Sequence, residues 1–171
     1  MSDWWRAVGD TVAEEFSDVP DAARLTRITV RLGLAAILGG VLGFERERSG
    51  KSAGLRTHML VALGSALFVL IPQQAGMTDG DLSRVLQGLV AGVGFLGAGA
   101  ILKSEADGEV KGLTTAAGLW LTAAIGVAAG LGREATAAVS TTLTLGILAV
   151  VPRVAGYFQR DPVPVRPKPK R

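Results

Sequence analysis

Five apolar segments, separated by short stretches that carry most of the charge, dominate the chain from residue 28 onward. They cover residues 28–44, 58–75, 86–102, 113–131 and 135–151. A bilayer core needs about 20 apolar residues in a helix, with about 17 as a lower limit, so each segment can cross a membrane. The pattern predicts an all-α membrane protein, a compact bundle of about five transmembrane helices within residues 28–152.

The first segment contains a charged residue, Arg31. An arginine near the start of a helix can extend its guanidinium to the membrane interface, so we expect a full span. A re-entrant hairpin, which enters and leaves the membrane on one side, is the alternative.

The two ends of the chain differ from this middle part. In residues 1–27, Trp4, Val8 and Val12 recur four residues apart, a spacing typical of an amphipathic helix. Tryptophan suits the headgroup region, so we expect this head to lie on the periplasmic membrane surface; packing against the chain's own helices is the alternative. Residues 153–171 are rich in proline and basic residues and are expected to form an extended cytoplasmic tail.

Lysine and arginine are distributed unevenly between the loops. The loops after the first and third segments, and the region after the fifth, contain Arg46, Arg48, Lys51, Arg56, Lys103, Lys111 and the basic tail. The other two loops contain only Arg84 and Arg133. Basic loops favour the cytoplasm, so we expect the N-terminus outside and the C-terminus inside. Arg24, Arg27 and Arg31, beside the first segment, oppose this orientation.

Glycines recur at helical spacing in three of the segments. Lipid tails give helices no hydrophobic reason to associate, so close packing depends on small residues. The candidate packing residues are Gly39, Gly43, Gly88, Gly92, Gly94, Gly97, Gly99, Gly118, Gly126 and Gly130. We expect packing within one protomer, with a dimer seam as the alternative. For the dense run from Gly92 to Gly99, a kinked or broken helix is a further alternative.

The composition restricts the chemistry. The chain has no cysteine and a single histidine, His58, which excludes thiolate chemistry and leaves a zinc enzyme short of ligands. No nucleophile is paired with a base, so we expect no enzymatic activity and no cofactor. The basic excess is concentrated in the last residues, which gives no support to nucleic-acid binding. The expected surroundings are the lipid bilayer.

Residues 43–58, GFERERSGKSAGLRTH, form a charged island between the first two segments. The alternating signs of residues 45–48 allow pairs on one helix face, so a solvated interfacial collar is one interpretation. Arg56 stands where a cation opposes the dipole of the second helix, which a nearby carboxylate or bound anion would explain. We interpret His58 as an interfacial residue at a helix start.

Three motifs occur in order over residues 39–68, 92–103 and 110–132: GGVLGFERERSGKSAGLRTHMLVALGSALF, GVGFLGAGAILK and VKGLTTAAGLWLTAAIGVAAGLG. Together they resemble the membrane domain of the MgtC/SapB family. The resemblance implies a bacterial inner-membrane protein linked to growth under magnesium limitation, to survival inside macrophages and so to virulence. In some members it implies restraint of the ATP synthase. Longer members carry an ACT-like domain after the last span, and we expect this chain to be without it.

The motif residues and the expected topology together indicate one polar cluster at the cytoplasmic helix ends. Its candidate members are Glu45, Arg46, Glu47, Lys51, Arg56, Thr57, Lys103, Thr114 and Thr115. We expect Glu45 and Arg56 to be its charged pair, with Thr114 and Thr115 at the start of the fourth span. A helix N-cap role for either threonine is the alternative. The sequence names no metal, and Glu45 is the best candidate ligand.

Two functions follow from these features. In the first, the protein acts through helix contacts, with itself as a homo-oligomer, a dimer being favoured, or with another membrane complex such as the ATP synthase. In the second, an oligomer forms a channel or carrier for Mg²⁺ or protons. Mg²⁺ prefers oxygen ligands, and Glu45 lies directly at the edge of the first span.

Overall fold

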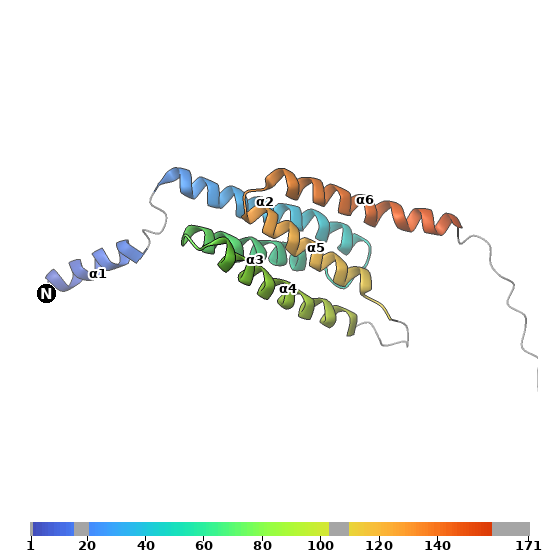
Figure 1. The fold of residues 1–171 in the computed structure, drawn as a ribbon, viewed down its shortest axis with the longest axis horizontal. Helices are drawn as coiled ribbons and strands as arrows, with labels where there is room; N and C mark the ends of the chain where they lie inside the picture. Colours follow the sequence, from blue (N-terminus) through green and yellow to red (C-terminus); the bar gives the residue numbers. More distant parts are fainter. Residues whose placement is uncertain (1, 16–20, 103–109, 159–171) are drawn as a thin grey trace, which may run out of the picture.

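A computed structural model describes residues 2–15, 21–102 and 110–158, and these residues form six helices (Figure 1). The helices are α1 (Ser2–Glu15), α2 (Ala22–Arg48), α3 (Leu55–Gln74), α4 (Asp79–Leu102), α5 (Leu113–Gly130) and α6 (Glu134–Phe158). Helices α2 to α6 are each long and apolar enough to cross a membrane. The predicted all-α bundle with five spans is therefore confirmed.

The first span is one continuous helix. α2 has 27 residues and passes through Arg31 without interruption, a length of about 40 Å at 1.5 Å per residue. Asp21 caps its start, because the side-chain Oδ1 accepts a hydrogen bond from the backbone N–H of Arg24 at 2.6 Å. The alternative of a re-entrant hairpin is wrong for this segment. α4 is likewise one helix through the dense glycine run.

Three helices form the centre of the bundle. α3 packs against both α2 and α5, while α4 covers α5 on one side and α6 lies against α5 and α2 on the other (Figure 1). The buried apolar core consists of mostly small residues of α2, α3, α5 and α6: Ala35, Leu42, Ala62, Ala66, Ile125, Ala129 and Ala137. Small side chains let helix backbones approach closely, which is how helices associate when lipid surrounds them.

Glycines of α2 and α5 make these approaches possible. A methyl group added at Gly39 would lie 2.6 Å from the carbonyl oxygen of His58 in α3, and one at Gly43 would lie 2.7 Å from the Cα of Leu55. At Gly126 the added group would overlap the carbonyl oxygen of Ala62, again in α3. α3 is therefore held from two sides by helices whose glycines face its backbone.

Both ends of the described chain extend away from this core. α1 lies apart from the bundle (Figure 1), and its described side chains are exposed, including Trp4 and Trp5 at 61% and 66%. α1 therefore does not pack on the described transmembrane helices. At the other end, α6 continues to Phe158, so the tail expected to be extended from residue 153 begins as helix. The apolar residues Val150, Val151 and Val154 continue the helical segment. Residues 159–171 lie outside the described part.

Candidate functional site

The candidate site starts from a charged residue on the buried face of α2. Ala35, Gly39, Leu42 and Arg46 are buried and recur at intervals of four, three and four residues, which places them on one face of a helix. This face packs against α3 and α5. Arg46 is only 3% exposed, so a guanidinium lies among the ends of three helices.

Arg46 joins residues from two helices. Its Nη2 donates a long hydrogen bond of 3.4 Å to the Oγ1 of Thr115 in α5, which is also buried. Its Nη1 lies 3.9 Å from Oε2 of Glu45, whose other oxygen accepts a hydrogen bond of 2.8 Å from Ser49. Among the described residues, neither Arg46 Nε nor Glu45 Oε2 has a hydrogen-bond partner, although both atoms are buried. A donor and an acceptor are therefore available to a polar ligand.

His58 lies beside this group in α3 and is 1% exposed. Its ring Nδ1 donates a hydrogen bond to the carbonyl oxygen of Gly54 at 3.0 Å, so in the neutral ring the lone pair belongs to Nε2. Gly39 and Gly43 of α2 face this residue, and a methyl group added at Gly118 of α5 would lie 3.7 Å from Nε2. His58 does lie at the start of α3, as expected, but its side chain is buried, because glycines on two neighbouring helices make room for the imidazole.

Glu47 has a local structural task. Its Oε2 accepts a hydrogen bond of 2.8 Å from the backbone N–H of Leu55, the first residue of α3. The residue at the usual capping position, Gly54, has no side chain to do this, and a methyl group there would lie 2.6 Å from the Glu47 oxygen. A carboxylate at a helix N-terminus also stabilises the helix dipole. Glu47 therefore fixes the turn between α2 and α3.

The structure brings together only part of the predicted cluster. Glu45, Arg46 and Thr115 are in contact, whereas four other candidates are exposed: Lys51, Arg56, Thr57 and Thr114. The expected pair of Glu45 with Arg56 is not formed, since Glu45 contacts Arg46 instead. The helical period of α2 explains this, because it places Arg46 on the buried face. Lys103 lies outside the described residues.

The start of α5 contradicts the alternative in which Thr114 or Thr115 is the N-cap. Its N-cap is Gly112, which has a φ of +92° and makes no side-chain capping hydrogen bond. A left-handed conformation at this point is readily adopted only by glycine. Thr114 and Thr115 lie within the helix, so neither is the N-cap.

The predicted packing glycines fall into two groups. Gly39, Gly43, Gly97, Gly118, Gly126 and Gly130 have a neighbour against the position of an added methyl group. Four glycines of α4 have none within 4 Å: Gly88, Gly92, Gly94 and Gly99. Packing within the protomer therefore does not account for the second group.

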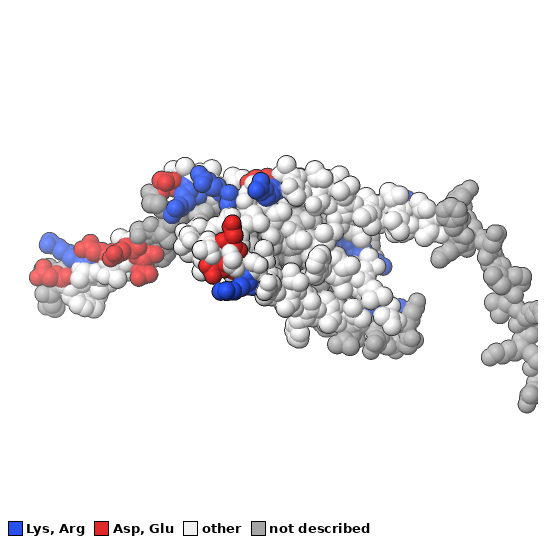
Figure 2. Space-filling model, viewed as in Figure 1, with Lys and Arg blue, Asp and Glu red and all other residues white. Residues whose placement is uncertain are grey.

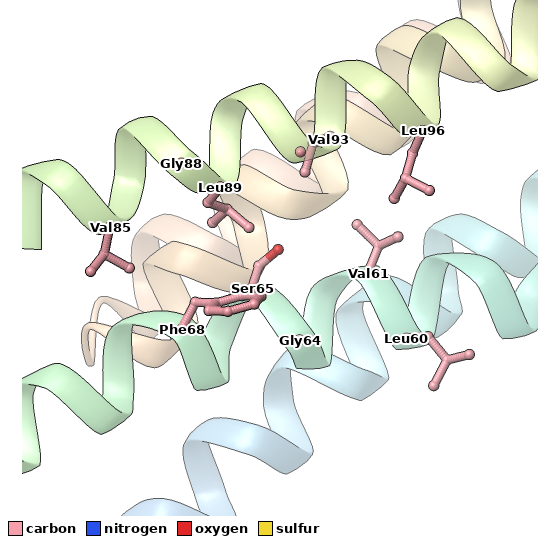
Figure 3. Close-up of a pocket in the computed structure, with 11 residues that line it drawn as sticks. Leu60, Val61, Gly64, Ser65, Phe68, Val85, Gly88, Leu89, Val93 and Leu96 are labelled. Carbon is pink, nitrogen blue, oxygen red and sulfur yellow. The ribbon is translucent and has the colours of Figure 1, made fainter.

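Two of these α4 glycines lie in a groove between α3 and α4 (Figure 3). The groove has a volume of about 660 Å³, and its walls are apolar apart from the Ser65 hydroxyl, which points into it. Gly88 and Gly92 line one wall and Gly64 lines the other, where an added methyl group would also have no neighbour. The rest of the lining is bulky, including Leu60, Phe68 and Leu96. Glycines here leave space that no described side chain fills.

The apolar part of α2 is short for a membrane span. Between Arg31 and Glu45 the helix carries the apolar run 32–44, which measures about 20 Å, whereas a bilayer core measures about 30 Å. Both charged ends therefore lie near or inside the hydrocarbon edge, where an unpaired charge is costly. This explains why Arg31 and Arg46 turn towards polar groups of other helices. The middle of the bundle surface carries few charges (Figure 2).

The chain is similar to several known proteins. The model of the MgtC family matches residues 32–157. SrpB of Synechococcus elongatus is 48% identical over 69% of this chain and 71% of its own length. YhiD of Escherichia coli is 44% identical over 71% of the chain and MgtC of Brucella abortus 45% identical over 68%.

The matched region spans 59% of YhiD and 48% of the Brucella protein. No solved structure matches the chain significantly. The family match begins within α2, includes α3, α4 and α5, and ends within α6, so it contains Glu45, Arg46 and Thr115. The chain therefore belongs to the MgtC family, as a multi-pass membrane protein.

Proposed function

We propose that the protein serves bacterial adaptation to low magnesium and survival inside host cells, by contact of its helices with other membrane complexes. The family match supports the link to magnesium, as does the name of YhiD, which marks that relative as a candidate magnesium transporter. The proposed location is the inner membrane, with the N-terminus outside and the C-terminus in the cytoplasm, because the more basic loops lie at one end. The proposed role is not enzymatic.

The open glycine face of α4 carries this proposal. Helices α2 and α5 pack glycines against α3, but Gly88 and Gly92 face a groove with no neighbour. Small residues in a transmembrane helix favour close approach of another helix, and a groove between two helices offers it two walls. We infer that the groove receives a transmembrane helix of a partner protein. The ATP synthase is one candidate partner, and a second copy of the chain, as a dimer, is another.

The experiment is growth of a strain without the gene, in medium low in magnesium, after complementation with variants. Gly92→Leu fills the groove, and we expect it to abolish growth rescue without lowering the amount of protein. Gly146→Leu is the matched control, because Gly146 is an exposed glycine of α6 that also has no neighbour within 4 Å. Full rescue by Gly92→Leu, or equal failure of both variants, would contradict the proposal.

The alternative, an ion channel or carrier formed by an oligomer, has one specific observation in its favour. Glu45 Oε2 is a buried carboxylate oxygen without a hydrogen-bond partner in the described structure. Such an oxygen suits a cation such as Mg²⁺. Within the described ranges, however, no three acidic or histidine side chains are grouped so as to hold a metal ion. Mg²⁺ or proton flux into liposomes that wild type supports and Glu45→Gln abolishes would favour this alternative.

A further inference from the structure

A second polar site lies at the other end of the bundle, about 22 Å along α2 from Arg46. Here α2 and α3 enclose a cavity of about 230 Å³. Its polar lining consists of Arg24, Arg27, Arg31, Gln73 and Gln74, and two aliphatic side chains complete it. Basic side chains gather over the start of α2 (Figure 2). The cavity therefore combines three positive charges with two amides that can donate hydrogen bonds.

Arg31 is fixed in this cavity by the ends of two helices. Its Nη1 donates to Gln73 Oε1 at 3.2 Å and to the carbonyl oxygen of Gly130, at the end of α5, at 3.1 Å. Gly132, with a φ of +74°, leaves room for the guanidinium, which an added methyl group would overlap. The Nε of Arg31 is buried and has no hydrogen-bond partner among the described residues. This buried donor thus remains unused.

The ends of α2 and α5 do not need the positive charges of Arg24 and Arg27. Arg31 already donates a hydrogen bond to the carbonyl oxygen at the end of α5, and the C-terminal end of a helix favours a cation. Neither Arg24 nor Arg27 forms an ion pair with any described carboxylate. Asp21, the neighbouring acidic residue, caps α2 by accepting a hydrogen bond from the backbone N–H of Arg24. The distribution of basic loops indicates that these arginines lie on the external side of the membrane. The preference of basic residues for the cytoplasmic side therefore does not explain their presence.

We propose that this cavity binds a phosphate group, carried either by an anionic lipid or by free phosphate. Guanidinium groups bind phosphate oxygens through paired N–H donors, which favours arginine over lysine in such sites. The cavity lies at the end of the apolar part of α2, the depth at which lipid headgroups meet a span. Arg31 forms its fixed inner wall, and the exposed Arg24 and Arg27 close around the ligand.

The lipid arm of the test uses nanodiscs of phosphatidylcholine with a minor fraction of phosphatidylglycerol, and native mass spectrometry counts the retained lipids. Wild type is expected to retain phosphatidylglycerol in preference. The double variant Arg24→Gln/Arg27→Gln is expected to lose at least about tenfold of this preference, since each arginine near anionic headgroups contributes about a factor of five. Arg84→Gln is the control, an exposed arginine of α4 near the same end of the bundle that does not line the cavity.

The second arm separates the two sources of phosphate. Protein in a sugar detergent, which contains no phosphate, is titrated with inorganic phosphate. Saturable binding that the double variant loses assigns the site to free phosphate, whereas retention of the anionic lipid alone assigns it to lipid. The thermal unfolding of both variants shows that they remain folded. The proposal is overturned if wild type binds neither ligand, or if the folded double variant binds both as wild type does.

Discussion

Two pairs of glycines with the same spacing have opposite surroundings in this bundle. Gly126 and Gly130 of α5 lie against the backbone of α3, where added methyl groups would collide with Ala62 and Ala66. Gly88 and Gly92 of α4 also lie four residues apart, and added methyl groups there would meet nothing within 4 Å. The first pair forms the fold. The second pair leaves a groove that the fold does not need.

The difference shows what a small-residue motif means in a membrane helix. The motif permits close approach, but it does not identify the neighbour. In α2 and α5 the neighbour is α3 of the same chain. In α4 we propose a helix of another protein. Substitutions at the α5 glycines should therefore destabilise the folded state. Substitutions at the α4 glycines should impair function and leave the folded state intact.

The largest effect is expected from Gly126→Leu. The added side chain must enter the space of the Ala62 carbonyl group, and neither backbone can move without separating α3 from α5. We expect no stable folded protein, as measured by yield and by a single peak in size-exclusion chromatography. Gly92→Leu, an equally large change at an open position, should give a normal peak. If both variants elute alike, the two glycine environments do not differ in the way described.

A smaller loss is expected from Arg46→Ala. The variant removes a buried guanidinium, leaves Glu45 Oε2 without the one cation that contacts it among the described residues and opens space beside Thr115. Removal of one partner of a buried ion pair suggests a cost of about 3 kcal/mol in the free energy of unfolding. Unfolding in mixed micelles measures it. Arg56→Ala, at the exposed arginine, should change nothing measurable; a similar loss in both variants would restore the pair of Glu45 with Arg56.

Loss of a helix cap should have a milder effect. Glu47→Ala removes the acceptor for the backbone N–H of Leu55, which suggests a cost of about 1 kcal/mol to the α2–α3 turn. Glu47→Gln retains a side-chain oxygen and should preserve most of the stability. The same unfolding measurement compares the two variants. Equal stability of Glu47→Ala and wild type would show that the capping bond contributes nothing.

The smallest effect is expected from Gly92→Ala. A methyl group at this position meets no neighbour, and alanine is the better helix former by about 1 kcal/mol in water. The free energy of unfolding should stay unchanged or rise slightly. A clear loss of stability would show that Gly92 packs within the protomer after all, as α5 glycines do.

The five spans could be predicted from the sequence, because the length and hydropathy of a segment are enough to show that it can cross the hydrocarbon core. Gly39, Gly43, Gly126 and Gly130 could be identified as small residues at helical spacing, and the structure places them at helix contacts. The glycines of α4 carry the same signal, so the sequence could not separate them. Which face of a helix meets a neighbour depends on the rotation of the helix in the bundle, which the motif does not contain.

The charged partner of Glu45 was missed for a similar reason. Arg46 follows Glu45 after the apolar run and belongs to the predicted polar cluster, but the sequence favours Arg56 as the partner of Glu45, because Arg56 opposes a helix dipole. The signal was present in the period of α2, because Ala35, Gly39 and Leu42 lead to position 46 on the same face. The burial of His58 had no such signal within its own helix. It depends on glycines of two other helices.

The central claim, that the groove between α3 and α4 receives a helix of a partner protein, can be tested by photo-crosslinking in living cells. A photoreactive side chain replaces Leu96, which lines the groove, or Ile147, an exposed residue of α6 that serves as the control. We predict a defined protein adduct from position 96 alone, and its loss when Gly92→Leu is added. Adducts to lipid only at both positions, or an adduct at position 96 that survives Gly92→Leu, would contradict the claim.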